Sequence, residues 1–174
     1  MRFGDRHRRA IVWTTLLLGI GLGIYTGLLL GTMVARPAWN SALMGPLFLT
    51  SGISTGAAVL LLARLDASES AMLVRWDIVA IAVELALLGM LLIGFMSGPT
   101  ATRAAADGLL GGPFTATFWS LVVLAGLVVP LILNLIEVRR HVPMTFLSPA
   151  FVLIGGLALR AIFVAAGQVT GAGG

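Results

Sequence analysis

Four ionisable side chains lie inside long apolar stretches of this sequence, where packing alone does not explain them. Asp77 and Glu84 are seven residues apart, so a helix places both carboxyls on one face. Arg160 lies in the last apolar stretch, and Tyr25 lies in the first at a similar predicted depth. Ionisable groups at such depths mark a polar pathway or a ligand site by default, and they are usually paired within a helix bundle.

The carboxyls and the guanidinium place different demands on their surroundings. A carboxyl in an apolar environment can take up a proton, whereas an arginine keeps its charge, so Arg160 needs a partner or water more than Glu84 does. We expect Glu84 and Arg160 to form either a functional polar path or a structural ion pair. Asp77, Glu137 and Arg64 are predicted near the cytoplasmic ends of their helices, where snorkelling or a solvated cap is the simpler interpretation.

Several other chemistries lack the residues they need. The sequence has no cysteine, which excludes disulfides, thiolate nucleophiles and iron–sulfur clusters ligated by this chain. His7 and His141 both fall in predicted cytoplasmic loops, so the sequence offers no intramembrane pair to ligate a haem. No spacing of acidic residues and histidines suits a metal, and no serine–histidine arrangement suggests a hydrolase. We expect neither a metal site nor catalytic residues in this chain.

The elements that must position these side chains are predicted membrane-spanning helices. Of the 174 residues, 59% are hydrophobic and 10% are charged, whereas about a quarter are charged in a soluble domain. A helix of about 20 apolar residues crosses the bilayer. Five stretches are long enough: residues 11–34, 43–63, 76–96, 114–136 and 146–168. We therefore predict one all-α membrane domain over residues 1–174, with a small surface helix in the external segment 97–113.

The distribution of arginine predicts the orientation. Eight arginines fall at one side of the predicted helices: Arg2, Arg6, Arg8, Arg9, Arg64, Arg75, Arg139 and Arg140. Only Arg36 and Arg103 fall at the other side, so the positive-inside rule predicts a cytoplasmic N-terminus and an external C-terminus. The net charge of +4 is too small and too scattered to indicate a nucleic-acid surface.

Small residues indicate close packing along the first two predicted helices. Glycines spaced by four share one face of the first helix, at Gly19, Gly23, Gly27 and Gly31. The second helix carries Gly52 and Gly56, with hydroxyl groups around them at Ser51, Ser54 and Thr55. Pro130 is expected to kink the fourth helix and free a carbonyl that Asn134 could satisfy. The four tryptophans are predicted near helix ends, as is typical of membrane interfaces: Trp13, Trp39, Trp76 and Trp119.

An ordered set of motifs resembles the NrfD/polysulfide-reductase family of membrane subunits over nearly the whole sequence after residue 15. The motifs are Gly23-Ile-Tyr-Thr-Gly-Leu-Leu-Leu-Gly31, Arg36-Pro-Ala-Trp-Asn40, the Pro46–Ala58 segment, Asp77 with Glu84, Gly112-Pro-Phe, Phe118-Trp119, Pro130, Leu159-Arg160 and Ala166-Gly-Gln168. Each motif alone is weak, and their order gives the resemblance its specificity.

This resemblance implies a membrane anchor and electron-transfer subunit of a respiratory oxidoreductase in a bacterial or archaeal cytoplasmic membrane. Such a subunit exchanges electrons between menaquinone or ubiquinone and a ferredoxin-like iron–sulfur subunit, which connects to a molybdopterin or multihaem catalytic subunit. The resemblance also suggests site residues. Tyr25, Arg160 and Gln168 are candidate contacts of the quinone, whereas Asp77 and Glu84 are candidates for a proton route.

The length of the sequence leaves alternatives open. Members of the resembled family typically have eight or more membrane spans, and the five predicted here correspond to the last five. The sequence is consistent with a gene fragment, a gene model begun at an internal methionine, half of a split subunit, or a reduced subunit completed by another polypeptide. A small proton- or solute-translocating bundle and a purely structural anchor are alternative functions for the same residues.

Overall fold

The computed structural model describes residues 3–33, 36, 38–63, 66–140 and 146–170. Within these ranges all regular secondary structure is helical. In sequence order the elements are α1 (Phe3–Gly31), α2 (Met44–Leu62), α3 (Ala67–Ser97), α4 (Thr100–Leu110), α5 (Thr115–Thr117), the π-helix η1 (Phe118–Val128), α6 (Val129–Arg140) and α7 (Leu147–Thr170).

The five predicted membrane helices are confirmed by length and composition. The segments that can cross a bilayer are Arg8–Gly31, Met44–Leu62, Ala67–Ser97, Thr115–Arg140 and Leu147–Val169. Four of them begin close to the predicted residue. The third begins at Ala67 and not near Trp76, because a polar first turn containing Glu69 extends the helix beyond its apolar core. An acidic side chain in that turn favours the positive end of the helix dipole.

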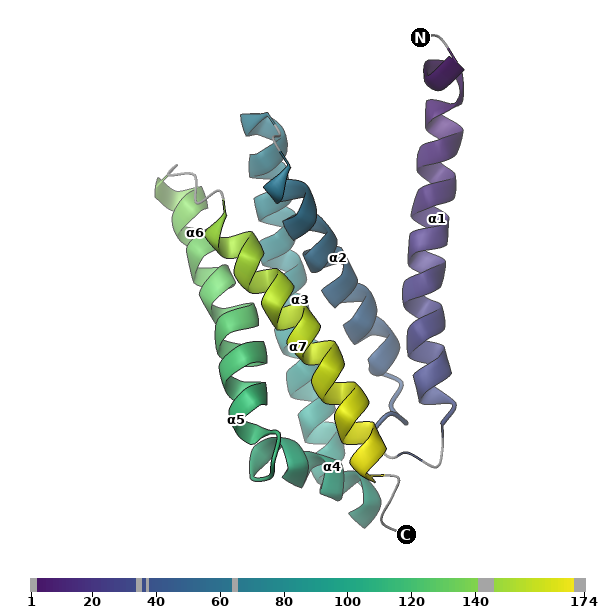
Figure 1. Cartoon of the computed structure of the whole chain (residues 1–174), viewed down its shortest axis with the longest axis vertical. Helices are drawn as coiled ribbons and strands as arrows, with labels where there is room; N and C mark the ends of the chain where they lie inside the picture. Colours follow the sequence, from purple (N-terminus) through teal and green to yellow (C-terminus); the bar gives the residue numbers. More distant parts are fainter. Residues whose placement is uncertain (1–2, 34–35, 37, 64–65, 141–145, 171–174) are drawn as a thin grey trace.

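Four of the spans form a bundle, and α1 stands beside it (Figure 1). The bundle consists of α2, α3, α7 and the continuous helix made by α5, η1 and α6. In the most apolar part of α1 only 6% of the residues are buried, compared with 28–44% in the other four spans. The α1 helix packs mainly against α2, and the two helices diverge towards the N-terminus of α1 (Figure 1).

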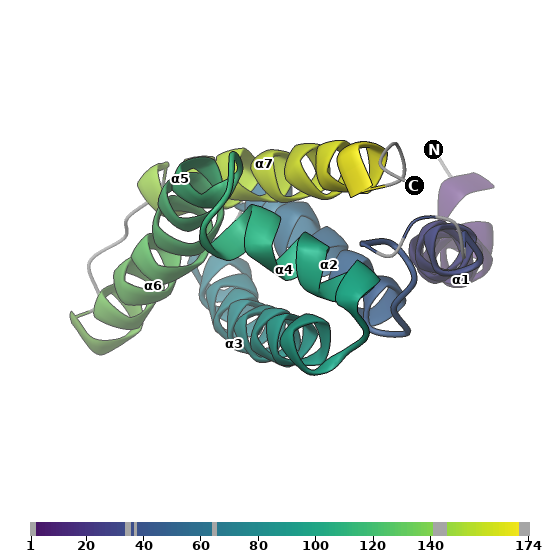
Figure 2. The ribbon, with the colours of Figure 1, turned by 90° about the horizontal axis from the view of Figure 1, so that it is seen from below.

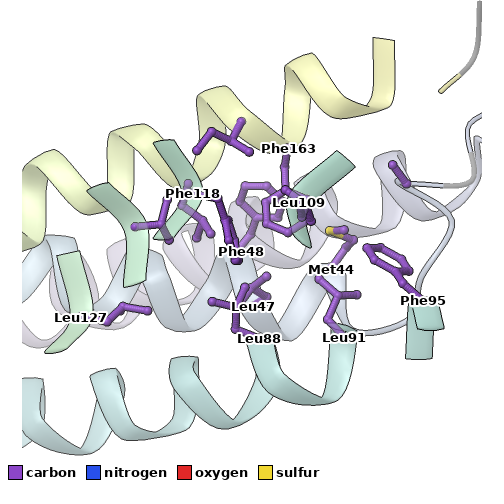
Figure 3. Close-up of a cluster of buried hydrophobic side chains, with 14 of the residues drawn as sticks. Met44, Leu47, Phe48, Leu88, Leu91, Phe95, Leu109, Phe118, Leu127 and Phe163 are labelled. Atoms are coloured by element: carbon purple, nitrogen blue, oxygen red, sulfur yellow. The ribbon is translucent and has the colours of Figure 1, made fainter. Parts of the chain in front are cut away.

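Large apolar side chains fill the end of the bundle near α4 (Figure 3). Phe48 of α2 meets Phe163 of α7 edge to face, with ring centroids 6.4 Å apart. The predicted surface helix is present as α4, which lies across the end of the bundle (Figure 2). It buries Leu109 and two alanines beneath it. This amphipathic helix therefore closes one end of the apolar core.

Glycines set the closest helix contacts, but only part of the predicted stripe takes part. A Cβ added to Gly27 would collide with the backbone of Gly45, and one added to Gly23 would lie 2.7 Å from the side chain of Leu49. Gly31 has a single neighbouring atom, 3.9 Å away. The remaining positions of the two predicted motifs face open space in this structure: Gly19, Gly52 and Gly56.

The closest backbone contact inside the bundle involves two glycines outside those motifs. Gly126 of η1 and Gly155 of α7 are buried, and a Cβ on either would overlap the backbone of the other. Gly126 lies in the π-helix, where the amide of Val129 donates to the carbonyl of Leu124. Because Pro130 has no amide hydrogen, it cannot make the ordinary helical bond to the carbonyl of Gly126. The π-helix therefore lies directly before this proline, where the ordinary helical bonding pattern is interrupted.

We predict that Gly155→Ala destabilises the bundle by about 1–3 kcal/mol, because the added methyl group overpacks the contact with Gly126. Gly94→Ala in α3 is the matched control, since no atom lies within 4 Å of its added Cβ. Alanine favours a helix over glycine by about 1 kcal/mol, so the control should be neutral or stabilising. Unfolding of both variants in detergent micelles measures the difference. Equal stabilities would contradict the proposed contact.

Candidate functional site

A chain of four buried polar side chains crosses the bundle. Ser54 Oγ donates to Asp77 Oδ1 at 2.6 Å, and Asn134 Nδ2 donates to Asp77 Oδ2 at 2.8 Å. Ser148 Oγ in turn donates to Asn134 Oδ1 at 2.5 Å. All four residues are at most 1% exposed, and they come from α2, α3, α6 and α7. We call these four residues the polar chain, and it joins the four spans of the bundle at one level.

The polar chain corrects two sequence-based interpretations. The interpretation of Asp77 as a solvated or snorkelling residue is wrong, because both of its carboxyl oxygens accept hydrogen bonds inside the bundle. The expectation that Asn134 satisfies a carbonyl freed by Pro130 is also wrong, because its amide group bonds Asp77 and Ser148 instead. Glu137 and Arg64 were also interpreted as solvated or snorkelling residues. Glu137 is partly buried, and Arg64 lies outside the described residues.

Sequence reasoning did not identify Ser148 as a site residue. The sequence did contain a feature that could have identified it, because Ser148 is one of three polar residues in the apolar stretch 146–168. A serine at the start of a membrane helix is, however, usually interpreted as a terminal residue near water. The contact of its hydroxyl with Asn134 is visible only in the fold, because Asn134 belongs to α6 and Ser148 to α7, the next helix in the sequence.

A second polar group lies two turns further along α3. Glu84 is 3% exposed, and its carboxyl is hydrogen-bonded with Ser51 of α2. Arg160 of α7 interacts with this carboxyl electrostatically, but the two residues form no ion pair within 4 Å. Instead, the guanidinium of Arg160 donates to the carbonyl of Gly156, one turn earlier, at 2.9 Å. Besides this bond, Arg160 lines a space next to the bundle.

That space is an apolar groove between α1 and α2. Its volume is about 970 Å³, and Arg160 is the one charged residue among those that line it. The walls are mostly aliphatic side chains, with Gly19 and Gly23 on α1 and Gly52 on α2 where side chains are missing. Gly19 and Gly52 have little packing function in this structure, and they widen the groove instead. We call this space the α1–α2 groove.

The structure does not bring all the predicted quinone contacts to this groove. Tyr25 is exposed and lies outside the lining of the groove, on a different face of α1. Gln168 is exposed near the end of α7 and is also not part of the lining. Arg160 alone of the three faces the groove, with Glu84 behind it.

The connection between α1 and α2 is fastened to the end of α7. Arg36 donates to the carbonyl of Gly167 at 2.7 Å, and its guanidinium lies 5.0 Å from the ring centroid of Trp39. The indole of Trp39 donates to the carbonyl of Phe163 at 2.7 Å. Trp39 is only 8% exposed, so at this end of the bundle its indole packs against protein. Gly167 has no side chain to obstruct the indole.

No group of three histidine, aspartate or glutamate side chains in the described residues could ligate a metal. The acidic residues that the bundle does bury are held by hydroxyl and amide groups. The polar chain and the α1–α2 groove therefore suit proton exchange and the binding of an apolar molecule with hydrogen-bond acceptors.

Comparison with known proteins gives a family match over residues 1–172, to the model described as polysulphide reductase, NrfD. Protein NrfD of Escherichia coli strain K12 is 34% identical over 171 residues, which cover 93% of this sequence and 54% of the relative. A relative in Wolinella succinogenes, named as one of the chains of polysulfide reductase, is 32% identical over 171 residues, which cover 92% and 54%. The protein described here thus spans about half the length of these curated relatives. No solved structure matches it.

We predict that Asn134→Leu destabilises the protein strongly, because it removes one partner from Asp77 and one from Ser148. Each buried group left without its partner costs about 1–3 kcal/mol. The matched control is Ser120→Ala, whose exposed hydroxyl bonds only the carbonyl of Ala116 on its own helix. Chemical unfolding in micelles should separate the two variants clearly. A leucine variant as stable as the control would show that the polar chain contributes nothing to folding.

Proposed function

Because the protein belongs to the polysulphide reductase NrfD family, we propose that this membrane subunit of a respiratory oxidoreductase exchanges electrons between a quinone and an iron–sulfur partner subunit. The partner must supply the clusters, since the sequence has no cysteine to ligate one. The Wolinella succinogenes relative is by its name one of the chains of polysulfide reductase, which supports a multi-subunit setting for this protein.

The observation that carries the quinone assignment is the α1–α2 groove with Arg160 at its wall. A quinone has an apolar ring and tail and two carbonyl oxygens that accept hydrogen bonds. The groove offers aliphatic walls along α1 and α2 and one guanidinium donor. A site that is mostly apolar with a few placed polar groups is typical of cofactor binding. We therefore assign the head-group contact in this groove to Arg160, with Tyr25 and Gln168 outside it.

Reduction of a quinone to a quinol consumes two electrons and two protons. In this proposal the partner delivers the electrons, and the buried carboxyls of Asp77 and Glu84 deliver the protons. Ser54 and Ser51 support the connection between the carboxyls, because they lie one turn apart on α2 and bond Asp77 and Glu84 respectively. Ser148, at the start of α7, extends the polar chain towards the predicted cytoplasmic side. Glu84, next to Arg160, is then the last proton donor before the quinone.

We predict that Arg160→Gln weakens the binding of a menaquinone analogue by roughly 10- to 100-fold. A hydrogen bond from a charged group contributes about 1.5–3 kcal/mol, and each 1.4 kcal/mol is a factor of ten in affinity. Titration of the purified protein in nanodiscs, followed by quenching of intrinsic tryptophan fluorescence, measures the dissociation constant. Arg103→Gln is the matched control, because Arg103 is exposed on α4 and bonds only the carbonyl of Gly98. Equal affinities in both variants would remove Arg160 from the site.

We predict a different result for Glu84→Gln. The amide keeps the size of the side chain and can still bond Ser51, but it cannot deliver a proton. Binding of the analogue should therefore be close to normal, while quinone reduction by the assembled complex slows by at least tenfold. Stopped-flow measurement of quinone reduction with the iron–sulfur partner present makes the test. Normal rates would exclude Glu84 from the proton route without affecting the binding assignment.

A further inference from the structure

We propose that Arg36 and Trp39 are positioning residues that hold α1 in a fixed orientation relative to α7 and thereby keep the α1–α2 groove in its binding form. Both residues belong to the connection between α1 and α2, which passes beside the end of α7 (Figure 1). Each donates a hydrogen bond to a carbonyl of that helix. We call these two residues, together with Phe163 and Gly167, which accept their bonds, the α7 clamp.

The clamp attaches to two successive turns of α7. The indole of Trp39 donates to the carbonyl of Phe163, and the guanidinium of Arg36 donates to the carbonyl one turn later, on Gly167. The guanidinium also lies over the indole ring, within the range of cation–π attraction. A positive charge at the last turn of a helix is favoured by the helix dipole as well. Because the two bonds lie on different turns, the connection cannot rotate about either bond without breaking the other.

The clamp is also tightly packed. The indole of Trp39 fills the place where a Cβ on Gly167 would lie, so the ring rests directly on the backbone of α7. Ala38, the residue before it, is fully buried too. A buried N–H group that loses its acceptor keeps the cost of its desolvation, so the indole has a strong preference for this one position. The connection between α1 and α2 is therefore fixed to α7 at a defined place.

The clamp matters for α1 because the helix itself has weak attachments. Its most apolar part is 6% buried, and its closest backbone contact is that of Gly27 with Gly45 on α2. The hydroxyls of Thr26 and Thr32 donate to carbonyls of α1 itself and not to another helix. Van der Waals contact at glycines limits how closely two helices approach, whereas hydrogen bonds depend on direction. The directional bonds that orient the end of α1 are thus those of the clamp.

The clamp connects the two sides of the α1–α2 groove. One side is formed by α1, and the charged group of the groove, Arg160, is held by α7, three residues before Phe163. Neither Arg36 nor Trp39 lines the groove, so a variant at either position can change binding only through the placement of the helices. This effect on binding rests on the proposed function, whereas the effect on the placement of α1 does not.

Distances between two spin labels in nanodiscs test the clamp without a ligand. The sequence has no cysteine, so cysteines introduced at Leu18 of α1 and Leu157 of α7 are the only labelled sites. Each leucine is 69% exposed, so a label there disturbs little packing. We expect Trp39→Phe, which keeps the ring and loses the donor, to make the distance distribution about twice as broad, because α1 then samples further orientations. Trp76→Phe is the matched control, since the indole of Trp76 is exposed, and it should leave the distribution unchanged.

Two substitutions of Arg36 give a second test. Arg36→Met keeps the length of the side chain but has no donor, so it should broaden the same distribution and weaken the binding of a menaquinone analogue by about tenfold. Arg36→Lys keeps the charge and a donor, so it should restore both the narrow distribution and the affinity. A merely structural role would not produce this rescue of binding.

The outcomes separate the clamp from the proposed function. Distance distributions that stay narrow in both Trp39→Phe and Arg36→Met would overturn the clamp. Broad distributions with unchanged affinity would overturn its positioning role at the groove. If the parent protein fails to bind the analogue, the proposed function fails, and the spin-label distances still decide whether the clamp holds α1 in place.

Discussion

The structure depends on one constraint of the bilayer: polar groups within it must find their partners inside the protein. Asp77 meets this constraint by receiving a hydroxyl from α2 and an amide from α6, and the same amide group accepts a hydroxyl from α7. Lipid provides little hydrophobic driving force for helix association, so directional bonds of this kind matter more for specifying the arrangement than an apolar face does. Asp77 and Asn134 together therefore link all four bundle helices and restrict the rotation of each about its own axis.

Close backbone contacts at glycines, together with the polar chain, determine how the bundle helices pack. Gly126 and Gly155 bring η1 and α7 together, and Gly156 leaves room beside it for Thr55 of α2 and for the guanidinium of Arg160. A larger residue at position 156 would meet both of these neighbours. The glycines thus do more than tighten the bundle. They also determine where the one charged residue of the α1–α2 groove is held.

Apolar length was sufficient to predict five membrane helices, because bilayer thickness constrains the length of a spanning helix directly. The small surface helix was predicted from the composition of the segment between two spans. The environment of Asp77 could not be predicted in this way, since its partners are 23 residues earlier and 57 residues later in the sequence. The similar predicted depth of Tyr25 and Arg160 was also insufficient to predict whether they line the same site. The depth of a residue depends on its position in the sequence alone. The direction in which its side chain points depends on how the helices rotate and cross, so residues at the same depth can lie on different surfaces.

The attachment of α1 has a mechanical consequence. The helix is held near one end, by the glycine contact at Gly27 and by the bonds that fasten Arg36 and Trp39 to α7. Any change in the tilt of α1 would therefore turn the helix about the region of Gly27. The arm from Gly27 to Ile11 is about 24 Å long at ~1.5 Å per residue, so a tilt of ~5° moves the far end by about 2 Å. The width of the α1–α2 groove consequently depends on the angle between α1 and α2.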